Sequence, residues 1–408
     1  MLDVTTKLVK RAYKYRFYPT PEQADLLART FGCVRLVYNK ALAERSRLYA
    51  TEGRNTTYVD TAHWLTEWKQ DPDLAFLAEV SNVPLQQALR NQQGAFSAFF
   101  AKRAKYPRFK SRHKSRASAT FMGNAFTFRD GRLKLAKMTD PLDIVWSRPL
   151  PDGATPSSVT VSRDSAGRWH VSMLVEESIQ HLPELDTSVG VDVGITSLVT
   201  LSTGEKITNP KHERADRRKL AKAQRELARK QRGSANRAKA KLSVARVHAR
   251  IADRRRDHLH KLSTRLIREN QTVVIEDLAV RNMVRNHSLA RAISDAAWFE
   301  LRRQLEYKAA WYGRTLVAVD RFYPSSKLCS TCGHRAASMP LSVRSWACPA
   351  CSAVHDRDIN AARNIVAAGL AETRNACGGP VRPEPRTRQR RSPTKQETPQ
   401  ATAGIPRL

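Results

Sequence analysis

The chain has 408 residues, of which 41% are hydrophobic, enough apolar material for about two to three folded domains. Its formal net charge is +33, and a folded protein carries such an excess only where a polyanion offsets the self-repulsion. The sequence contains no run of about 18 apolar residues, and its first 18 residues lack the apolar core of a secretory signal. We therefore expect no membrane span and no secretory signal, and the charge favours a nucleic-acid-binding protein.

The first predicted element is a strand. Along residues 8–18 the aromatic side chains of Tyr13, Tyr15 and Phe17 alternate with basic ones, which predicts a half-buried strand with a basic outer face. The segment Thr20-Pro21-Glu22-Gln23 is typical of a capping box with proline at the first helical position. The chain is therefore expected to pass from this strand into a helix.

A helical region follows this strand. Apolar residues continue at helical spacing to about residue 104, with breaks expected near Gly53, at Asp71-Pro72 and at Pro84. Residues 21–116 are accordingly interpreted as a helical insert. The end of the insert, residues 105–116, is rich in Lys and Arg with interleaved aromatic residues. This composition favours contact with nucleic acid, and the alternative is a solvated charged face.

Short strands dominate the next region, from Thr120 to Glu177. Alternating apolar residues mark each strand, and Gly131, Gly153 and Gly167 mark turns. We expect a small antiparallel sheet or barrel, completed by the first strand across the helical insert. The predicted strands contain residues 126–128, 133–135, 144–146, 159–161 and 169–173.

The most basic region is residues 211–256, where 18 Lys and Arg face four acids. A weak apolar stripe runs through this region, and Gly233-Ser234-Ala235-Asn236 is expected to split it into two long helices. An apolar stripe on helices that are otherwise basic is typical of a helix pair that packs on a domain through the stripe. The basic outer face of such a pair can contact nucleic-acid phosphates. The alternative is a solvated helical hairpin, which the excess of positive charge makes the weaker interpretation.

Two Cys-x-x-Cys motifs follow, Cys329/Cys332 and Cys348/Cys351, with fifteen residues between them. This spacing is typical of a zinc ribbon, in which four thiolates close a tetrahedral structural site. The alternative is a pair of disulfides or chance cysteines. Cys33 and Cys377 are interpreted as spectators, and the cysteine pattern as a whole fits a reducing cytoplasm.

Three acids are expected at the ends of secondary-structure elements. Asp192 lies in a strand followed by a turn and a second strand, Glu276 ends a continuous apolar strand, and Asp358 begins a helix. Such acids can converge on one edge of a sheet, where their oxygens would hold two Mg²⁺ or Mn²⁺ ions for phosphodiester hydrolysis. The neighbouring Asp277 and Asp356 are plausible decoys that could be mistaken for members of this set.

At these residues the sequence resembles the TnpB family of transposon-encoded RNA-guided DNA endonucleases, which are relatives of type V CRISPR effectors. The resemblance covers about residues 10–376. The matching motifs are Tyr13-Lys14-Tyr15-Arg16-Phe17-Tyr18-Pro19-Thr20, Tyr106-Pro107-Arg108-Phe109-Lys110, Gly190-Val191-Asp192-Val193-Gly194, Val274-Ile275-Glu276-Asp277-Leu278, Trp311-Tyr312-Gly313, Pro324-Ser325-Ser326-Lys327 and the cysteine ribbon through Asp356-Arg357-Asp358 to Ala362. One departure is Ser352, where the family usually has glycine after the last cysteine.

The resemblance implies a multidomain α/β protein with a RuvC/RNase H-like nuclease domain that contains an inserted zinc ribbon. It also implies an N-terminal β-barrel, the wedge, which carries the helical recognition insert. The expected parts in chain order are the first wedge segment at 1–20, the recognition insert at 21–116, the second wedge segment at 117–185, the first nuclease part at 186–322 with basic helices within 206–270, the zinc ribbon at 323–353, the last nuclease part at 354–377 and a disordered tail at 378–408.

The resemblance further implies Asp192, Glu276 and Asp358 as catalytic residues that bind Mg²⁺ or Mn²⁺, with structural Zn²⁺ on the four cysteines. A guide RNA from the transposon end would direct cleavage of double-stranded DNA beside a short transposon-adjacent motif. The expected particle is a monomeric ribonucleoprotein associated with the prokaryotic nucleoid. Three alternatives remain, namely a guided repressor without cleavage, a simple zinc-ribbon DNA-binding protein and a transposase that joins strands.

Overall fold

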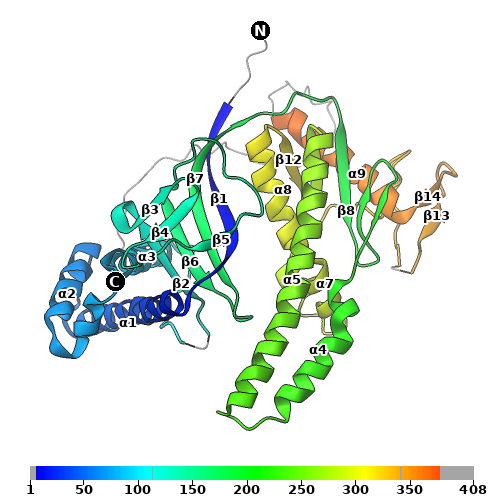
Figure 1. Cartoon of the computed structure of the whole chain (residues 1–408). Coiled ribbons are helices and arrows are strands. Elements are labelled where there is room, and N and C mark those ends of the chain that lie inside the picture. The colour runs from blue at the N-terminus through cyan, green and yellow to red at the C-terminus, as the bar shows by residue number, and fades with distance from the viewer. Residues whose placement is uncertain (1–5, 113, 341, 377–408) are drawn as a thin grey trace.

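The computed structural model describes residues 6–112, 114–340 and 342–376 (Figure 1). Two α/β parts make up this region, each built on a five-stranded sheet. The predicted disordered tail at 378–408 and the spectator Cys377 lie outside the described residues. Within the described residues, none of the helices has the length and apolar character needed to cross a membrane.

The first sheet has the strand order β2-β6-β7-β1-β5. Strand β1 (Thr6–Tyr18) pairs antiparallel with β7 (Trp169–Gln180), so the first strand does complete a sheet across the insert. The other strands are β5 (Asp143–Val145), β6 (Ser158–Arg163), β2 (Ala117–Met122) and the separate hairpin of β3 (Phe126–Arg129) and β4 (Arg132–Leu135). The predicted strands are confirmed, β2 was not predicted, and closure into a barrel stays a prediction.

The insert is helical, as predicted. Its elements are α1 (Pro21–Glu52), α2 (Tyr58–Gln70), the 3₁₀ helix η1 (Pro72–Ala78) and α3 (Asn82–Phe100). The capping box forms, because Thr20 and Gln23 each cap the other's backbone, and Gly53 ends α1 with a left-handed φ of 62°. The break expected at Pro84 falls at residues 79–81, just before α3. Pro84 itself lies in the first turn of α3, where a missing N–H costs no hydrogen bond.

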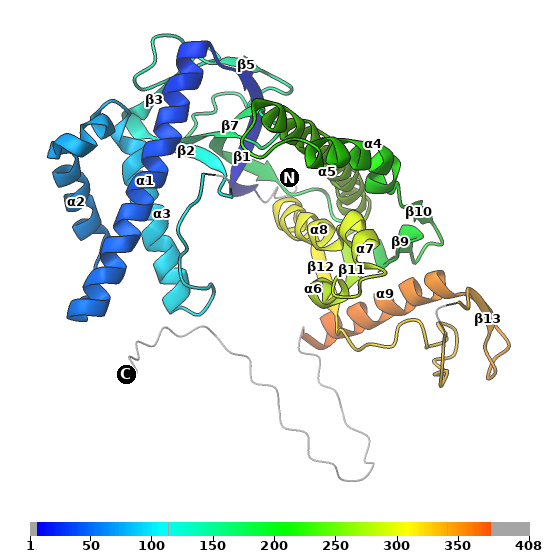
Figure 2. The same cartoon turned by 90° about the horizontal axis from the view of Figure 1, so that it is seen from below.

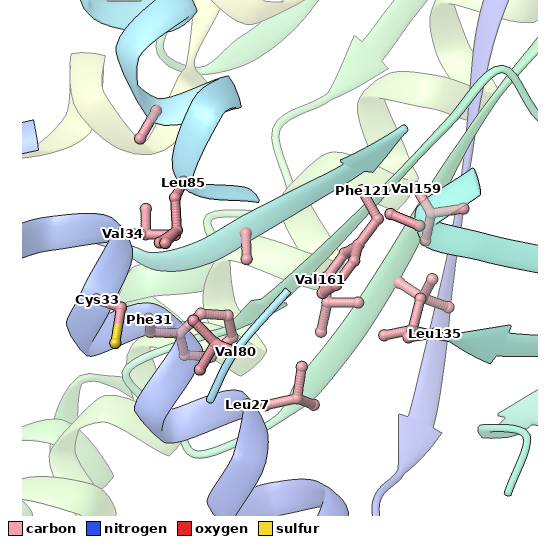
Figure 3. Packing of buried hydrophobic residues seen from close by; sticks show 14 of the residues in the cluster. Leu27, Phe31, Cys33, Val34, Val80, Leu85, Phe121, Leu135, Val159 and Val161 are labelled. Atoms are coloured by element: carbon pink, nitrogen blue, oxygen red, sulfur yellow. The ribbon is translucent and has the colours of Figure 1, made fainter. Parts of the chain in front are cut away.

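The helical insert and the first sheet share one hydrophobic core (Figure 3). Leu27, Phe31 and Val34 on α1 face the sheet, where Val159 and Val161 of β6 are fully buried. The lone Cys33 is buried in the same core, in keeping with its interpretation as a spectator. The insert is therefore packed on the sheet and is not an independent lobe.

The second sheet has the order β10-β9-β8-β11-β12. Its strands are β8 (Ser188–Val193), β9 (Ser197–Leu201), β10 (Lys206–Thr208), β11 (Thr272–Glu276) and β12 (Thr315–Val319). The first three pair antiparallel, while β11 runs parallel to both β8 and β12. The parallel strands β8 and β11 therefore end at the same edge of the sheet.

Two long helices connect β10 to β11. They are α4 (His212–Ala228) and α5 (Ala235–Glu269), with Ser234 capping α5 through the backbone N–H of Arg237. The predicted division of the basic region into two helices is confirmed. Figure 1 shows α4 and the first half of α5 extending beyond the second sheet.

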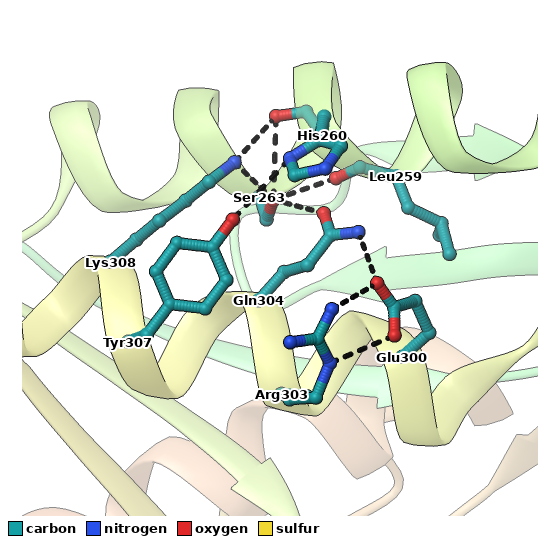
Figure 4. Close-up of polar contacts among 8 residues, drawn as sticks. All are labelled: Leu259, His260, Ser263, Glu300, Arg303, Gln304, Tyr307 and Lys308. Carbon is teal, nitrogen blue, oxygen red and sulfur yellow. Dashed lines mark hydrogen bonds and ion pairs between the residues drawn. The ribbon is translucent and has the colours of Figure 1, made fainter. Parts of the chain in front are cut away.

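The second half of α5 packs against α8 (Trp298–Tyr312) through buried polar contacts (Figure 4). Lys308 donates to the carbonyl oxygen of His260 at 2.8 Å and to the hydroxyls of Ser263 and Thr264, both at 2.7 Å. Each N–H of the ammonium thus has an acceptor. Burial nevertheless lowers the pKa of Lys308 to about 8.

The remaining elements lie between β11 and the end of the described chain. They are the short helices α6 (Val280–Met283) and α7 (Ala290–Ala296), the ribbon strands β13 (Ser345–Ala347) and β14 (Val354–Asp356), and the final helix α9 (Arg357–Ala376). Helix α9 packs against β8, β9, β11 and β12. The cysteine ribbon therefore lies in the chain between the last sheet strand and the helix that covers the sheet.

Candidate active site and metal centre

The three predicted acids occupy the same edge of the second sheet. Val191 of β8 pairs with Ile275 of β11, so Asp192 and Glu276 each follow the last paired residue of two adjacent parallel strands. Asp358 lies in the first turn of α9, which packs on those strands. The expected arrangement of two strand acids and one helix acid is therefore what the chain forms.

The electrostatics show that these carboxylates interact. Burial raises the pKa of Asp192 well above its usual value, and the negative charges of Glu276 and Asp358 raise it further, while Arg357 opposes them. Burial also raises the pKa of Glu276, an effect that the hydrogen bond from Ser325 partly offsets. A hard divalent cation bound by these carboxylates would reduce the repulsion between their negative charges.

Glu276 has a partner that the sequence did not predict. The hydroxyl of Ser325 donates to Glu276 Oε1 at 2.7 Å, which fixes the carboxylate at the end of β11. Ser325 is buried and begins the segment that leads into the ribbon. The only sequence signal for this role was its place in the Pro324-Ser325-Ser326-Lys327 motif.

The alternative acid Asp277 is engaged in ion pairs. Its carboxylate accepts from both Arg302 of α8 and Arg321 after β12. The hydrogen bond from Arg302 is the main reason that the pKa of Asp277 lies below its usual value, and Arg321 adds to it. Asp277 therefore links three segments, with each of its two oxygens bound to an arginine.

The alternative acid Asp356 caps α9. Its Oδ1 accepts the backbone N–H groups of Asp358 and Ile359, both at 3.1 Å, and its Oδ2 pairs with Lys206 at 2.6 Å. Burial alone would raise the pKa of Asp356, but Lys206 and the backbone donors hold it below its usual value. Asp356 thus orients the turn that carries Asp358.

The four cysteines come together as predicted. Their sulfur atoms all lie within 4.8 Å of one another. Cys329 and Cys351 are 3.7 Å apart, and Cys332 and Cys348 are 3.6 Å apart, against about 3.8 Å for thiolates arranged tetrahedrally at a Zn–S distance of about 2.3 Å. The cluster therefore fits a structural zinc ion.

Over the described ranges, this cysteine cluster is the one group of three or more His, Cys, Asp or Glu side chains close enough together to hold a metal ion. The acids Asp192, Glu276 and Asp358 share a sheet edge, but their oxygen atoms do not all lie as close to one another as the four sulfur atoms do. Arg344 lies 3.6 Å from one oxygen of Asp358. The acids therefore share a sheet edge without forming a closed cluster of ligands.

The ribbon is fastened to α9 by two asparagines one helical turn apart. Asn360 Nδ2 donates to the carbonyl oxygen of Leu328 at 2.6 Å, and its Oδ1 accepts from the backbone of Ser330 at 2.8 Å. Asn364 donates to the carbonyl oxygens of Ser325 and Leu328. The first cysteine knuckle and the helix of Asp358 are thereby one unit.

His355 gives the cluster a further contact that the sequence did not predict. Its Nε2 lies 3.0 Å from Cys329 Sγ, and the ring is buried. Burial alone would raise the pKa of Cys329, but the backbone N–H groups of Cys332 and Thr331 and the ring of His355 lower it to about 5. Such donors are typical of the outer shell of a metal site.

A basic groove lies where α5 meets the first sheet. It encloses about 520 Å³ and is lined by Arg16 and Tyr18 of β1 and by Arg246 and Arg250 of α5, among others. An ion pair between Arg168 and Asp253 joins the two parts across this groove. The positive face predicted from residues 211–256 therefore continues onto β1.

Known proteins resemble this chain over nearly its whole length. A protein of Streptomyces pristinaespiralis named "Putative RNA-guided DNA endonuclease" is 67% identical over 98% of this chain and 99% of its own length. The "Putative RNA-guided DNA endonuclease InsQ" of Escherichia coli K12 is 34% identical, covering 95% and 97%. The chain belongs to the TnpB family. The similarity to these two relatives covers the candidate site together with almost all of the remaining chain.

Three domain families match segments of this TnpB-family chain. Residues 170–287 match a "Probable transposase" family, residues 298–365 match the "Cas12f1-like, TNB domain", and residues 7–54 match a "Helix-turn-helix domain". In the structure this last segment is strand β1 followed by the single helix α1. The Cas12f1 chain in a cryo-EM structure of the Cas12f1-sgRNA-target DNA complex shares the fold, with a TM-score of 0.55 at 13% identity over 88% of this chain.

Proposed function

We propose that this chain is an RNA-guided, divalent-metal-dependent endonuclease that cleaves double-stranded DNA next to a short transposon-adjacent motif. The observation that carries the proposal is the position of Asp192, Glu276 and Asp358 at one sheet edge in a TnpB-family chain. The relatives that match it over nearly their whole length are named as RNA-guided DNA endonucleases.

The proposed nuclease domain is RuvC-like. In support, the order β10-β9-β8-β11-β12, with three antiparallel strands followed by two parallel ones, is that expected of an RNase H-type sheet. The wedge barrel, the recognition insert and the boundaries given above are part of the same proposal. So are a guide RNA from the transposon end, a single copy of the chain in the ribonucleoprotein, and action in the prokaryotic cytoplasm at the nucleoid.

In this proposal Asp192 and Glu276 bind two Mg²⁺ or Mn²⁺ ions from the strands, and Asp358 binds from α9. Bound divalent ions would activate water and stabilise the leaving oxygen. Ser325 holds the Glu276 carboxylate in place, and Asp356 holds the first turn of α9. Guide pairing supplies the sequence specificity, while the protein contacts the backbone and the flanking motif.

The decisive experiment separates cleavage from binding. RNA that copurifies with the protein is sequenced, and matching DNA is incubated with the protein, with and without that RNA, in Mg²⁺. We expect cutting only with the RNA, no cutting by Asp192→Ala, and similar guided DNA affinity for both proteins. Glu276→Ala and Asp358→Ala should behave like Asp192→Ala, whereas the control Asp277→Ala, whose carboxylate serves two arginines, should retain more activity.

Each alternative has its own outcome in this experiment. Guided binding without cutting under any divalent metal would identify a repressor. Binding that ignores the RNA would identify a simple zinc-ribbon DNA-binding protein, and strand joining without a guide would identify a transposase. Near wild-type cutting by Asp192→Ala would show that the nuclease site lies elsewhere.

A further inference from the structure

An aromatic pocket lies at the far end of the helical insert, away from the candidate nuclease site. It has a volume of about 500 Å³ and lies between the end of α1, the end of α3 and the loop that follows α3. Tyr49 is 64% exposed and Phe100 is 68% exposed, although both border this pocket. Large aromatic faces left open in a hollow of this size are typical of a ligand site.

The inner aromatic walls of the pocket pack against one another. The Tyr106 ring stands edge-on to Phe96 and Phe99, with ring centroids 5.5 Å and 5.3 Å apart, and its hydroxyl lies 2.9 Å from Ser46 Oγ on α1. Phe100 stacks on Phe96 at 6.3 Å with an interplanar angle of 25°. Little side-chain freedom would be lost when a flat ring enters.

The polar groups of the pocket indicate what kind of ring would fit. Arg45 is buried, and its Nη2 donates to Thr57 and Gln93, but its Nε has no acceptor among the described residues. Arg54 at the rim pairs with Asp60 at 3.5 Å. The described residues that line the pocket include no carboxylate. Two guanidinium groups disfavour a cationic guest and favour a ring that carries hydrogen-bond acceptors.

The loop beside the pocket is positively charged. It is fixed along α1 because Asn39 exchanges two hydrogen bonds, each of 2.8 Å, with the backbone of Lys110. Figure 2 shows this loop turning back from the end of α3 toward β2. Four of its cations are exposed and make no ion pair within the described part of the chain, namely Lys102, Arg103, Lys105 and Arg108. Cations of this kind can track a phosphate backbone.

We propose that this pocket binds an unpaired nucleobase of a single strand, stacked on Tyr49 and Phe100, while the loop cations hold the adjoining phosphates. Aromatic platforms flanked by positive charge are the general means by which proteins bind single strands. The inference rests on the proposed function only in that the chain binds nucleic acid. The strand is either the RNA or single-stranded DNA, which share this chemistry.

The test compares strands with and without bases. Full-length protein is titrated with fluorescent oligothymidine, with oligouridine, and with an abasic strand of equal length, at one salt concentration. The abasic strand keeps the phosphates, so the ratio of the affinities isolates stacking. We expect wild type to prefer the strands that carry bases, and Tyr49→Ala/Phe100→Ala to lower that preference about tenfold or more.

Two further variants serve as controls. Phe76→Ala removes an aromatic residue that is 42% exposed elsewhere in the insert and should leave the preference unchanged. Phe100→Trp restores an aromatic face and should retain it. Because Tyr49 and Phe100 are largely exposed, the double variant is expected to melt like wild type. An unchanged preference in the double variant overturns the proposal.

Cross-linking distinguishes the two sources of the strand. A 5-iodouracil base is placed either in the copurifying RNA or in target DNA, and cross-linked peptides are identified by mass spectrometry. Cross-links to Tyr49, Phe100 or Tyr106 support the proposal, and the labelled strand that gives them is the source. Cross-links that fall only on other residues overturn the proposal. A double variant that changes from dimer to monomer but keeps its base preference also overturns it, because the pocket would then be an interface between two copies of the chain. Neither the binding experiment nor the cross-linking experiment measures DNA cleavage, so their results are independent of whether the chain is a nuclease.

Discussion

Gly190 of β8 lies directly against the carbonyl oxygen of Ala362 on α9. A Cβ atom at residue 190 would collide with that oxygen and would lie 2.9 Å from the backbone nitrogen of Val366. The neighbouring atoms belong to backbone, so neither side can yield without moving the helix. The absence of a side chain at Gly190 therefore sets the distance between the strand of Asp192 and the helix of Asp358.

We accordingly predict that Gly190→Ala impairs cleavage. The helix must shift, and a displacement of about 1 Å at a reacting centre can lower the rate about a hundredfold. The measurement is the single-turnover cleavage rate with guide RNA and Mg²⁺. Gly94→Ala is the matched control, since nothing lies within 4 Å of a Cβ added there. Equal rates for the two variants would contradict the role assigned to this close approach.

The cysteine cluster yields a second prediction. Cys348→Ser should remove zinc and unfold the ribbon, because zinc binding in isolated fingers supplies on the order of 10 kcal/mol of folding free energy. Cleavage should fall as well, since Asn360 and Asn364 tie the first knuckle to α9. Metal analysis should find one zinc per wild-type chain and none in the variant, with Thr331→Ala as the control. An unchanged melting profile would count against the site.

A substitution at Ser352 is predicted to strengthen zinc binding rather than weaken it. Its φ of 57° lies in the left-handed region, as does the φ of 75° at Gly333, the corresponding residue of the first knuckle. A serine there is strained by about 1 kcal/mol relative to glycine. Ser352→Gly should therefore slow the loss of zinc to a chelator by about fivefold, whereas Ser352→Ala, which keeps the Cβ atom, should give no gain. Similar behaviour of the two variants would exclude backbone strain as the cause.

The basic helices should contact nucleic-acid backbone. Lys222, Lys239, Arg246 and Arg250 are exposed and form no ion pair within residues 6–112, 114–340 and 342–376. Changing all four to Gln should weaken RNA binding and flatten its salt dependence by roughly 0.7–0.9 log units per lost phosphate contact. Lys261→Gln, which removes a cation paired with Asp257 at 2.8 Å, is the control. An identical salt slope in the fourfold variant would show that these faces are only solvated.

Lys308 should give the stability a distinctive pH dependence. Its pKa is about 8 in the folded chain against an ordinary value of 10.5, so the unfolded chain binds more protons between these pH values. The cost of charging Lys308 is fully present below about pH 8 and disappears as the pH rises toward 10.5. It amounts to about 3 kcal/mol at most. In Lys308→Met this gain at alkaline pH should be missing, so parallel pH profiles of the melting temperature would refute the assignment.

The features that the sequence predicted well are those that local chemistry determines. The alternation around Tyr15, the capping box at Thr20 and the cysteine spacing each involve neighbours in the chain, and each was confirmed. Strand β2 escaped prediction because Ala117–Met122 has no strong apolar alternation and takes its place by pairing with β6.

The unpredicted parts of the candidate site depend on long-range contacts. Ser325 reaches Glu276 across 49 positions, and Lys206 reaches Asp356 across 150. No local pattern encodes such pairs. For the same reason the two arginine partners of Asp277, which the sequence already places second to Glu276, could not be predicted.

The position of α9 also orders events during protein synthesis. Strands β8 and β11 leave the ribosome before α9, and Asp358 follows Glu276 by 82 positions. At about 5–20 residues per second, translation of that stretch takes roughly 4–16 s. In that interval the nascent chain already has the basic helices α4 and α5 but not its last acid. If the proposed function holds, the chain therefore acquires its basic helices before the last acid of the nuclease site has been synthesised.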